Sequence, residues 1–227
     1  MIKRQFLKKF EKPMMTVDVV FFTIDQNKLK VLLVKRKYDP YGGFWALPGG
    51  FIRKNEEMYE AAARELKEET GVRGVYLEQL YTLGALGRDP RGRVVTVAYF
   101  ALAPRPTKKL KPSYDAAEAG WFLVDKLPRL AFDHKKIIVY ALRRVRNKIQ
   151  YTNAAWSLLP ATFSLGEGQK VYESILGHRL DKRNFRKKFL SLGLLQKISK
   201  VRRGLRQRPA QLYKFKTKKY VELKRFF

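Results

Sequence analysis

The feature that most constrains this chain is residues 50–72, where glutamates gather near the end of a predicted helix. Residues 57–70 carry apolar side chains at helical spacing and stop before a glycine, which predicts an amphipathic helix with Tyr59, Ala61, Ala62 and Leu66 on its apolar side. Glu65, Glu68 and Glu69 are spaced i, i+3 and i+4, so they share one helix face. Three neighbouring carboxylates repel one another, and a divalent cation such as Mg²⁺ or Mn²⁺ relieves that repulsion. The stretch therefore predicts a metal site; the alternative is a solvated acidic face paired with neighbouring basic side chains.

The first two thirds of the chain alternate between strand and helix patterns. Runs rich in Val, Leu and Phe are typical of strands, and the polar turn at residues 25–27 predicts a hairpin. Strands are expected at residues 17–24, 29–35, 75–83, 94–103 and 119–124, and helices at 57–70 and 127–147. This order predicts an α/β sandwich. No segment approaches the roughly 20 apolar residues that span a bilayer, so we expect no membrane partner.

The last third of the chain has a different pattern. Ser164 can cap a helix that runs to residue 176, and Asp181 can cap a second helix that ends near Gly193. Two short strands are expected at residues 194–198 and 211–215, with a basic, turn-rich loop between them. Helix, helix, strand, loop and strand form the layout of a winged helix-turn-helix.

Two domains follow from these patterns. We expect an α/β domain at residues 1–148 and a small winged-helix domain at residues 149–227. The first helix of the second domain is either the segment 127–147 or the segment 154–159, and the sequence does not decide between them.

The charge of the chain is strongly positive, at a formal +29. Residues 151–227 hold 19 basic and 4 acidic residues, whereas residues 1–150 hold 30 and 16. A basic terminal domain favours a polyanionic partner, nucleic acid first, although solubility alone is the alternative explanation. The chain has no cysteine, which excludes disulfides and thiolate metal sites and fits a reducing cytoplasm. The basic N-terminus is not followed by an apolar run, so we expect no signal peptide.

The stretch at residues 50–72 resembles the Nudix box, G-x5-E-x7-R-E-U-x-E-E-x-G-U with U apolar, and LPGG precedes it. The matching residues are Gly50, Glu56, Arg64, Glu65, Leu66, Glu68, Glu69, Gly71 and Val72. The resemblance implies a Nudix α/β/α sandwich. It also implies a hydrolase that uses Mg²⁺ or Mn²⁺ to cleave a nucleoside diphosphate linked to another group.

The resemblance assigns roles within the box. It implies that Glu65 and Glu69 are the main metal ligands, that Glu68 is an auxiliary ligand, and that the carbonyl of Gly50 completes the shell. It also implies an ion pair between Glu56 and Arg64 that orients the loop on the helix; an ion pair of little energetic weight is the alternative.

The base that activates water is left open by the resemblance. It is either Glu65 or a carboxylate on a loop before the last strand, for which Asp115 and Glu118 are the candidates. Both are equally compatible with being exposed acids.

Basic and aromatic side chains outside the box are candidates for binding the nucleotide. Arginine makes bidentate contacts with phosphate oxygens, and an aromatic ring can stack on a base. The candidates are Arg36, Phe44, Arg88, Arg91 and Arg93. Trp45 is expected in the core, and His134 is expected to make structural hydrogen bonds rather than to catalyse.

The resemblance extends over about residues 15–215. The segments FWALPGGF, YLEQLYTLG, RDPRGRVVTVAYFAL, LAFDH and LDKRNFRKK look like one Nudix subgroup. It holds ADP-ribose pyrophosphatase-like proteins and NrtR-type transcriptional regulators of NAD metabolism. The resemblance implies that ADP-ribose or a related metabolite binds the Nudix domain and that a homodimer binds double-stranded DNA. Several members have a degenerate box and sense their ligand without cleaving it; the intact box of this chain keeps hydrolysis in the prediction.

Side chains of the tail are suited to DNA. Arginine and asparagine match guanine and adenine edges in the major groove, and arginines of a wing reach phosphates or the minor groove. The candidates are Lys182, Arg183, Asn184, Arg186 and Lys187 on the helix, and Arg202, Arg203, Arg206 and Arg208 on the wing. We expect Phe185, Phe189 and Leu190 to pack inward; a solvated helix and a loose loop are the alternative.

Three functions therefore stay open. The first is an NrtR-like regulator that binds, and hydrolyses or only senses, ADP-ribose or a relative. The second is an ADP-ribose pyrophosphatase whose tail serves dimerisation. The third is an RNA-directed Nudix protein, which the net positive charge outside the tail favours.

Overall fold

The computed structural model describes residues 10–72, 75–104, 110, 116–204, 207–217 and 220–223. Two candidate residues, Asp115 and Arg206, lie outside these ranges. Among the helices in the described ranges, none is long and apolar enough to cross a membrane.

The first domain is built around strand β1 (Met14–Asp25), which lies in the middle of a seven-stranded sheet. β1 pairs antiparallel with β2 (Lys28–Arg36) and parallel with β6 (Val94–Leu102). The remaining strands are β3 (Trp45–Ala46), β4 (Gly49–Phe51), β5 (Tyr76–Leu83) and β7 (Ala116–Leu123). The main path through the sheet is β3-β2-β1-β6-β5, with β4 on β1 and β7 on β2.

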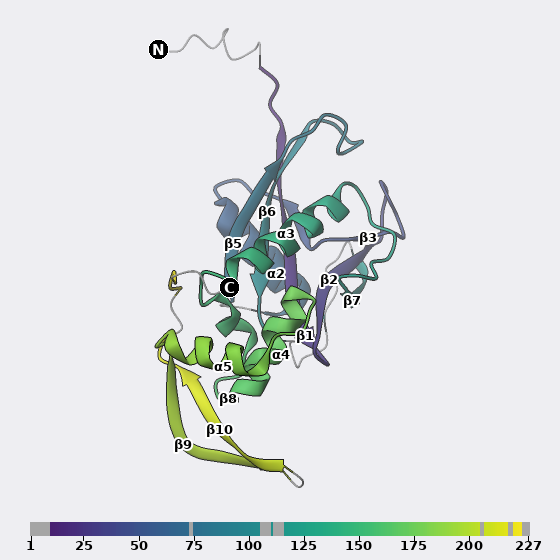
Figure 1. Ribbon diagram of the computed structural model, residues 1–227. Coiled ribbons are helices and arrows are strands. Elements are labelled where there is room, and N and C mark those ends of the chain that lie inside the picture. Colours follow the sequence, from purple (N-terminus) through teal and green to yellow (C-terminus); the bar gives the residue numbers. More distant parts are fainter. Residues whose placement is uncertain are drawn as a thin grey trace, which may run out of the picture.

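Two helices cover opposite faces of this sheet, α2 (Met58–Thr70) and α3 (His134–Lys148) (Figure 1). Side chains alternate between the faces of a strand. Accordingly Val17, Val19 and Phe21 share a buried cluster with Ala61, Ala62 and Leu66 of α2. Val20 and Phe22 share another with Ile137, Ile138 and Ala141 of α3. The predicted Nudix α/β/α sandwich is confirmed.

Local signals explain most element boundaries. Gln26 and Asn27, between β1 and β2, have φ of 51° and 56°, as a two-residue hairpin turn requires. Gly71 ends α2 with φ of 73°, a left-handed value that favours glycine. Two expectations were wrong. Tyr59 of α2 is exposed rather than buried, and α3 begins only at His134, because the Pro128-containing segment before it does not form helix.

The second unit has the predicted winged-helix order. It contains a short 3₁₀ helix η1 (Ala154–Leu158), strand β8 (Phe163–Ser164), and helices α4 (Leu165–Leu176) and α5 (Lys182–Ser191). Strands β9 (Leu195–Gly204) and β10 (Gln207–Phe215) follow, and the sheet order is β8-β10-β9. The predicted helix caps are confirmed: Ser164 accepts a hydrogen bond from the backbone of Glu167, and Asp181 accepts one from that of Asn184.

The wing is longer than expected. The basic stretch between the two expected strands is itself mostly strand, because β9 and β10 pair along nearly their whole length. The register shifts between Gln207 and Ala210, where Pro209 cannot donate a ladder hydrogen bond. The turn residues that suggested a loop are thus accommodated by an irregularity in the hairpin.

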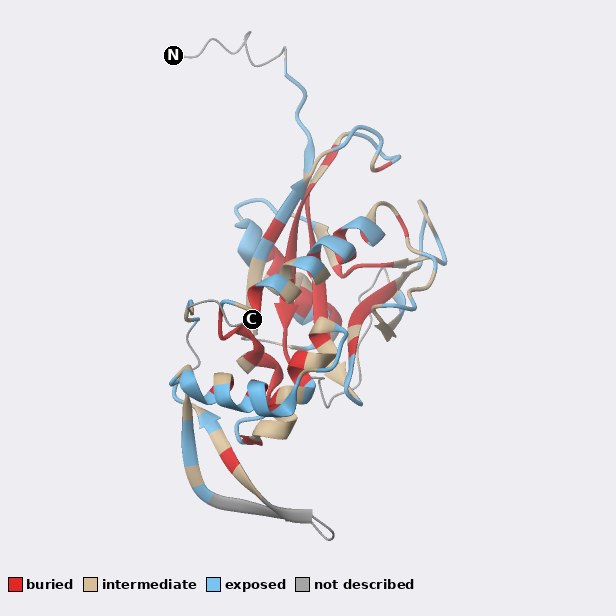
Figure 2. Ribbon diagram, in the orientation of Figure 1, coloured by how far each residue is buried: buried red, intermediate tan, exposed pale blue. Residues whose placement is uncertain are grey.

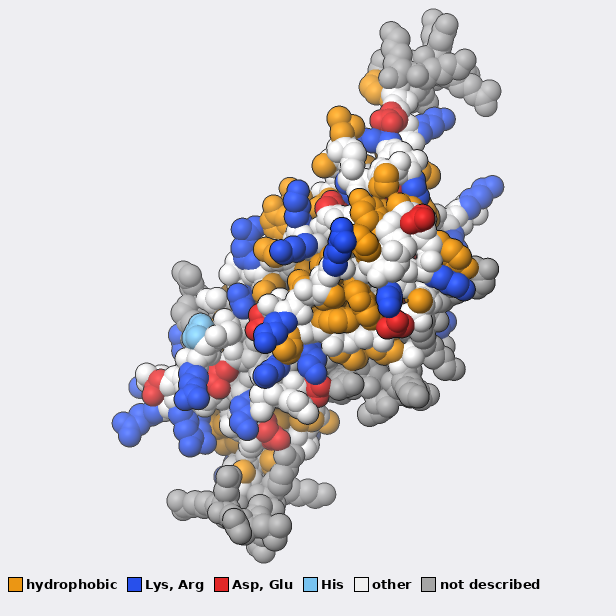
Figure 3. All heavy atoms as spheres, turned by 90° about the vertical axis from the view of Figure 1, so that its right-hand side faces the viewer, with side chains coloured by type: hydrophobic (Ala, Val, Ile, Leu, Met, Phe, Trp, Pro, Cys, Tyr) orange, Lys and Arg blue, Asp and Glu red, His pale blue; other side chains and the backbone are white. Residues whose placement is uncertain are grey.

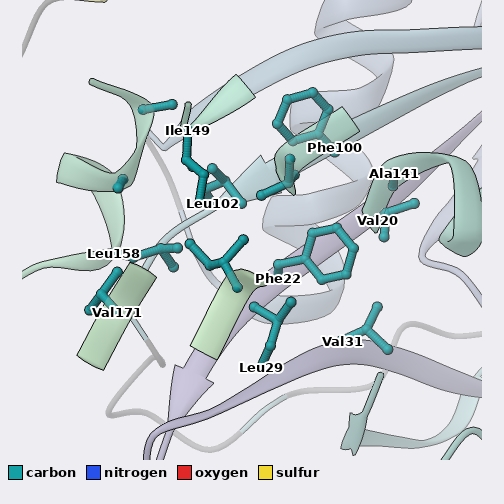
Figure 4. Close-up of a cluster of buried hydrophobic side chains, with 14 of the residues drawn as sticks. Val20, Phe22, Leu29, Val31, Phe100, Leu102, Ala141, Ile149, Leu158 and Val171 are labelled. Atoms are coloured by element: carbon teal, nitrogen blue, oxygen red, sulfur yellow. The ribbon is translucent and has the colours of Figure 1, made fainter. Parts of the chain in front are cut away.

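The winged helix packs onto the sheet through a shared apolar core. Figure 4 shows Phe22 and Leu102 of the sheet beside Leu158 and Val171 of the second unit. Behind them, the rings of Tyr172, Phe185 and Phe189 lie 5.1–5.6 Å apart and hold α4 against α5. α3 packs on the sheet whereas η1 leads into β8, which favours η1 as the start of the winged-helix unit. The boundary between residues 1–148 and 149–227 stays a prediction.

The C-terminal residues 220–223 return to the junction between the two units. The backbone of Val221 exchanges hydrogen bonds with Asn153, and Leu223 donates one to Tyr151 at 2.7 Å. Lys148, buried at the end of α3, donates to Tyr220 at 3.1 Å and pairs with Glu78 of β5 at 2.8 Å. Burial opposes the charge of Lys148, but these hydrogen bonds outweigh it and hold its pKa above the ordinary value. These contacts attach residues 220–223, which follow the winged helix in the chain, to the sheet domain.

Replacing the cap of α4 is expected to destabilise the winged helix. Ser164→Ala removes the hydrogen bond to the backbone of Glu167, so the free energy of unfolding should fall by about 1 kcal/mol in urea denaturation. Ser164→Asp keeps a capping oxygen and is the control. Equal losses for both variants would contradict the assignment of the cap.

Candidate functional site

A cavity of about 110 Å³ lies beside strands β1, β2 and β4 and the loop between β5 and β6. The last turn of α2 and the first residue of α3 also border it. Its polar lining includes Asp18, Arg36, Glu69, Arg91 and His134, and Phe132 supplies an aromatic wall. The Nudix-like stretch reaches this cavity through Gly50 and Glu69. Three of the five predicted nucleotide-binding residues also line it, namely Arg36, Arg88 and Arg91.

Arg64 organises the carboxylates of the box. Its Nε and a terminal nitrogen donate to the two oxygens of Glu56 at 2.6 and 3.0 Å, so the predicted ion pair is present and bidentate. The hydrogen bond from Arg64 is the main reason that the pKa of Glu56 falls from its ordinary 4.5 to about 2. The other terminal nitrogen of Arg64 pairs with Glu65 at 2.7 Å and with Glu68 at 3.3 Å. Glu56 does not line the cavity. It holds Arg64, which in turn pairs with Glu65 and Glu68 on the helix.

The third carboxylate of the face, Glu69, is the most buried. Glu69 is only 2% exposed and lines the cavity, whereas Glu68 is exposed at the surface and also contacts Arg53. Within the described ranges, no group of three or more His, Cys, Asp or Glu side chains is arranged as a metal site. Arg64 pairs with both Glu65 and Glu68 and compensates part of their charge. The predicted ligand set stays a prediction.

The donor chemistry nevertheless fits Mg²⁺ or Mn²⁺. A Cβ on residue 50 would come within 2.3 Å of the Glu65 carboxylate, so a side chain at this position would displace that carboxylate from the backbone. A Cβ on Gly49 would likewise meet the carbonyl of Val17 at 2.2 Å. The Glu65 carboxylate therefore lies beside the backbone of Gly50, and carboxylate and carbonyl oxygens are the ligands that these hard cations prefer.

A buried polar network, centred on Asp18, borders the same cavity. Asp18 accepts a hydrogen bond from Thr96 at 2.7 Å, and its other oxygen lies 3.5 Å from Nε2 of His134. Nδ1 of His134 accepts a hydrogen bond from the backbone of Leu47 at 2.8 Å, so the proton of the neutral ring sits on Nε2, toward Asp18. Burial lowers the pKa of His134 and keeps the ring neutral. The structural role predicted for His134 is present: it holds the loop that leads into Gly49 and Gly50.

Sequence reasoning missed Asp18, although it is the one acid within the mostly apolar run at residues 17–24. That irregularity was the available signal. The partner residues come from distant segments, which no local pattern connects.

The predicted nucleotide-binding arginines differ in their surroundings. Arg88 is buried and makes a bidentate pair with Asp133 at 2.7 and 3.1 Å, so two nitrogens of its guanidinium group already have a carboxylate partner. Arg91 is partly exposed, makes a bidentate pair with Asp89 at 2.7 and 3.0 Å, and lies 5.7 Å from the ring centre of Phe132. Arg36 lies over the same ring at 5.0 Å. Phe132, which sequence reasoning also missed, thus contacts two guanidinium groups at the cavity.

Phe132 has a left-handed backbone, with φ of 50°. Such a conformation is rare for a bulky residue and needs support from its surroundings. Tyr41 and His134 supply it, with ring centres at 4.8 and 5.3 Å. Nothing in the sequence signals this conformation.

Three other candidates lie outside the cavity. Arg93 donates to the carbonyl of Gly84 at 2.6 Å, and Phe44 packs under Arg129 with 4.3 Å to its ring centre. Glu118 is inside β7 rather than on a loop, its side chain is 57% exposed, and it pairs with Lys35 at 2.9 Å. The expectation that Glu118 belongs to a loop was therefore wrong, because β7 begins earlier in the chain than the sequence pattern suggested.

The helix predicted to read DNA presents a polar surface. Lys182, Arg183, Asn184, Arg186 and Lys187 of α5 are all exposed, as the pale blue of this helix in Figure 2 shows. Phe185 and Phe189 are buried as expected. Leu190 is 44% exposed, so its predicted inward packing was wrong; Phe189 already fills the inward position at that turn. Of the predicted wing arginines, Arg202 and Arg203 lie in β9 and Arg208 in β10.

Comparison with known proteins identifies both halves of the chain. The NUDIX domain model matches residues 12–161, and the model for the NrtR DNA-binding winged helix domain matches residues 155–215. The chain is 37% identical to the ADPR responsive transcriptional repressor NtrR of Acinetobacter baylyi, over 96% of this chain and 90% of that protein. It is 40% identical to an ADP-ribose pyrophosphatase of Methanocaldococcus jannaschii, over 60% of this chain and 79% of that enzyme.

A solved structure shares the whole architecture. Shewanella oneidensis NrtR, crystallised with a 27mer DNA, is 36% identical and superposes with a TM-score of 0.77. The match covers 89% of this chain and 93% of that one.

The Glu56–Arg64 pair is expected to make stability depend on pH. Because the pKa of Glu56 is lowered in the folded chain, its contribution is complete above pH 4.5 and is lost as the pH falls toward 2. Glu56→Gln should lower the free energy of unfolding by about 1 kcal/mol at pH 7. The difference from the unmodified chain should shrink below pH 4.5. Urea denaturation between pH 7 and 2.5 measures both quantities, and a difference that is independent of pH would contradict this role.

Proposed function

This chain belongs to the Nudix family and ends in an NrtR winged-helix domain, and on that basis we propose that it is an ADP-ribose-responsive, DNA-binding transcriptional regulator. The observation that carries the proposal is similarity along nearly the whole chain to a repressor that combines both domains. The exposed basic side chains of α5 support the DNA-binding half, because side chains of this kind read base edges and contact phosphates. We expect a regulator of this kind to act in the cytoplasm. A homodimer is part of the proposal, since operators are generally read by two-fold dimers.

The cavity supports the ligand-binding half. Arg36 and Arg91 are partly exposed and both lie against the ring of Phe132, and their guanidinium groups suit the oxygens of a diphosphate. The cavity is smaller than the roughly 300 Å³ at which ligand pockets begin, so it suits the diphosphate portion of ADP-ribose, with the sugars and base toward the surface. Arg88 acts indirectly, by holding Asp133 at the start of α3.

Hydrolysis is a second candidate function, favoured by the complete set of glutamates and by the similarity to an ADP-ribose pyrophosphatase. Glu65, Glu68, Glu69 and the carbonyl of Gly50 would hold Mg²⁺ or Mn²⁺. When bound, the metal neutralises phosphate charge and lowers the pKa of water. Glu56 orients Arg64, and Arg36 and Arg91 hold the diphosphate against the helix face. Glu65 remains the candidate base, while Glu118 would require a substrate that extends beyond the cavity.

Specific DNA binding is expected to depend on α5. In mobility-shift assays with the DNA upstream of its own operon, Asn184→Ala should weaken binding by about 1–3 kcal/mol and reduce sequence discrimination. Lys12→Ala, an exposed lysine before β1, is the control and should bind like the unmodified chain. ADP-ribose should change the affinity of the unmodified chain. The absence of any sequence-specific shift, with and without ADP-ribose, would refute the regulatory proposal.

Turnover is expected to depend on Glu69. With Mg²⁺, the unmodified chain should convert ADP-ribose to AMP and ribose 5-phosphate, and Glu69→Gln should lower the rate at least about 100-fold. Lys67→Gln, on the same helix but exposed, is the matched control. NADH and diadenosine polyphosphates, assayed with product identification, define the substrate. If calorimetry shows ADP-ribose binding but no product forms, the chain senses the ligand without cleaving it and the hydrolase proposal fails.

A further inference from the structure

A second, wider hollow of about 710 Å³ lies where the two units of the chain meet. The turn between β1 and β2 and the segment after β7 form its wall on the Nudix side. The outer face of α4 and the turn that follows it form the other wall. The walls are joined directly, since the hydroxyl of Ser174 on α4 donates to the carbonyl of Asn27 in the β1–β2 turn at 2.8 Å. We call this hollow the junction groove.

The junction groove is positively charged. Its exposed cations are Lys28 and Lys126 from the Nudix side and Lys170 and Arg179 from the winged-helix side. None of the four makes an ion pair with another residue of the described ranges, so their charges face solvent. Figure 3, which views the side that carries β2 and β7, shows basic side chains spread over this face with fewer acidic ones between them.

The acids of the junction groove do not cancel this charge. The groove contains Asp125 and Glu173. Glu173 is committed within the winged helix, where its carboxylate accepts hydrogen bonds from the backbone of Leu180 and the amide of Gln169, both at 2.9 Å. With Arg146 also in the lining, five cations face two carboxylates.

The chemistry of the lining indicates what kind of anion fits. The described lining contains no Phe, Tyr or Trp, and the imidazole of His178 is its one ring, so it lacks the aromatic platform on which successive nucleobases stack. Exposed lysines act as mobile point charges rather than as fixed forks, which suits the repeated phosphates of a backbone. The groove is also continuous along the chain with α5, because Arg179 precedes the first residue of that helix, Lys182, by three positions.

We propose that the junction groove receives the sugar-phosphate backbone of DNA as it leaves α5, so that Lys28 and Lys126 of the Nudix domain are part of the DNA-contacting surface. The inference rests on the proposed DNA-binding function and extends it beyond the winged helix. It gives DNA a direct contact with the domain that holds the nucleotide cavity. The affinity for DNA would then depend on how the two units are arranged relative to one another.

The test compares two double variants of equal charge, Lys28→Ala with Lys126→Ala, and Lys12→Ala with Lys54→Ala. Both pairs are exposed lysines of the Nudix domain, but only the first pair lines the groove. Affinity for a random-sequence duplex and for the upstream duplex is measured by fluorescence anisotropy over a series of salt concentrations. Each lost phosphate contact reduces the slope of log K against log salt by about 1.

The groove variant should reduce the slope by about 2 and weaken both duplexes equally, while the control pair leaves the slope unchanged. An unchanged slope for the groove variant, or an equal reduction by the control pair, would overturn the inference. Circular dichroism and unfolding in urea verify that both variants are folded. The two proposals fail separately: if the upstream duplex is never preferred over the random one, the regulatory proposal fails, while the slopes on the random duplex still decide the role of the groove.

Discussion

Burial of β1 on both faces is the constraint from which the rest of this molecule follows. A strand without a solvent face must be covered on both sides, and its alternating side chains divide the core into an α2 half and an α3 half. Asp18 belongs to the same side of the strand as Val20 and Phe22, which is why it meets His134 at the start of α3. Glu69 of α2 and His134 of α3 thus reach one cavity from opposite layers. Strand geometry brings these two layers together, and the loop between β5 and β6 completes the lining.

The carboxylates of the site are compensated mainly by one arginine. Carboxylates with little exposure are costly unless they are paired, and Arg64 provides that pairing for Glu56, Glu65 and Glu68. A divalent cation would compete with Arg64 for two of these groups while leaving its bidentate pair with Glu56 intact. The same arginine can therefore stabilise the helix face without a metal and remain anchored when one binds.

Local features of the molecule could be predicted from the sequence, whereas contacts between distant segments could not. The β1–β2 turn, the extent of α2 and the caps at Ser164 and Asp181 depend on neighbouring residues, and their signals are strong. The Glu56–Arg64 pair was accessible only through the family pattern. By contrast, Asp18 and Phe132 owe their importance to partners far along the chain or to a backbone angle. The misplacement of Leu190 and Tyr59 has one origin, because apolar character alone does not say which face of an element a neighbour covers. Glu118 was misplaced for another reason, since strand β7 begins earlier than its apolar residues indicate.

The returning residues 220–223 give the winged helix a second attachment to the sheet domain, at residues 151–153, in addition to the continuous chain that enters it there. Entry and exit of this unit are thus side by side. Rotation about this edge of the unit leaves both attachments in place, whereas sliding across it would break the hydrogen bonds of residues 151–153. Strands β9 and β10 run away from the junction (Figure 1), so such a rotation would displace their far part further than any residue near the junction. A small tilt of the unit would therefore become a large displacement of the two strands of the wing.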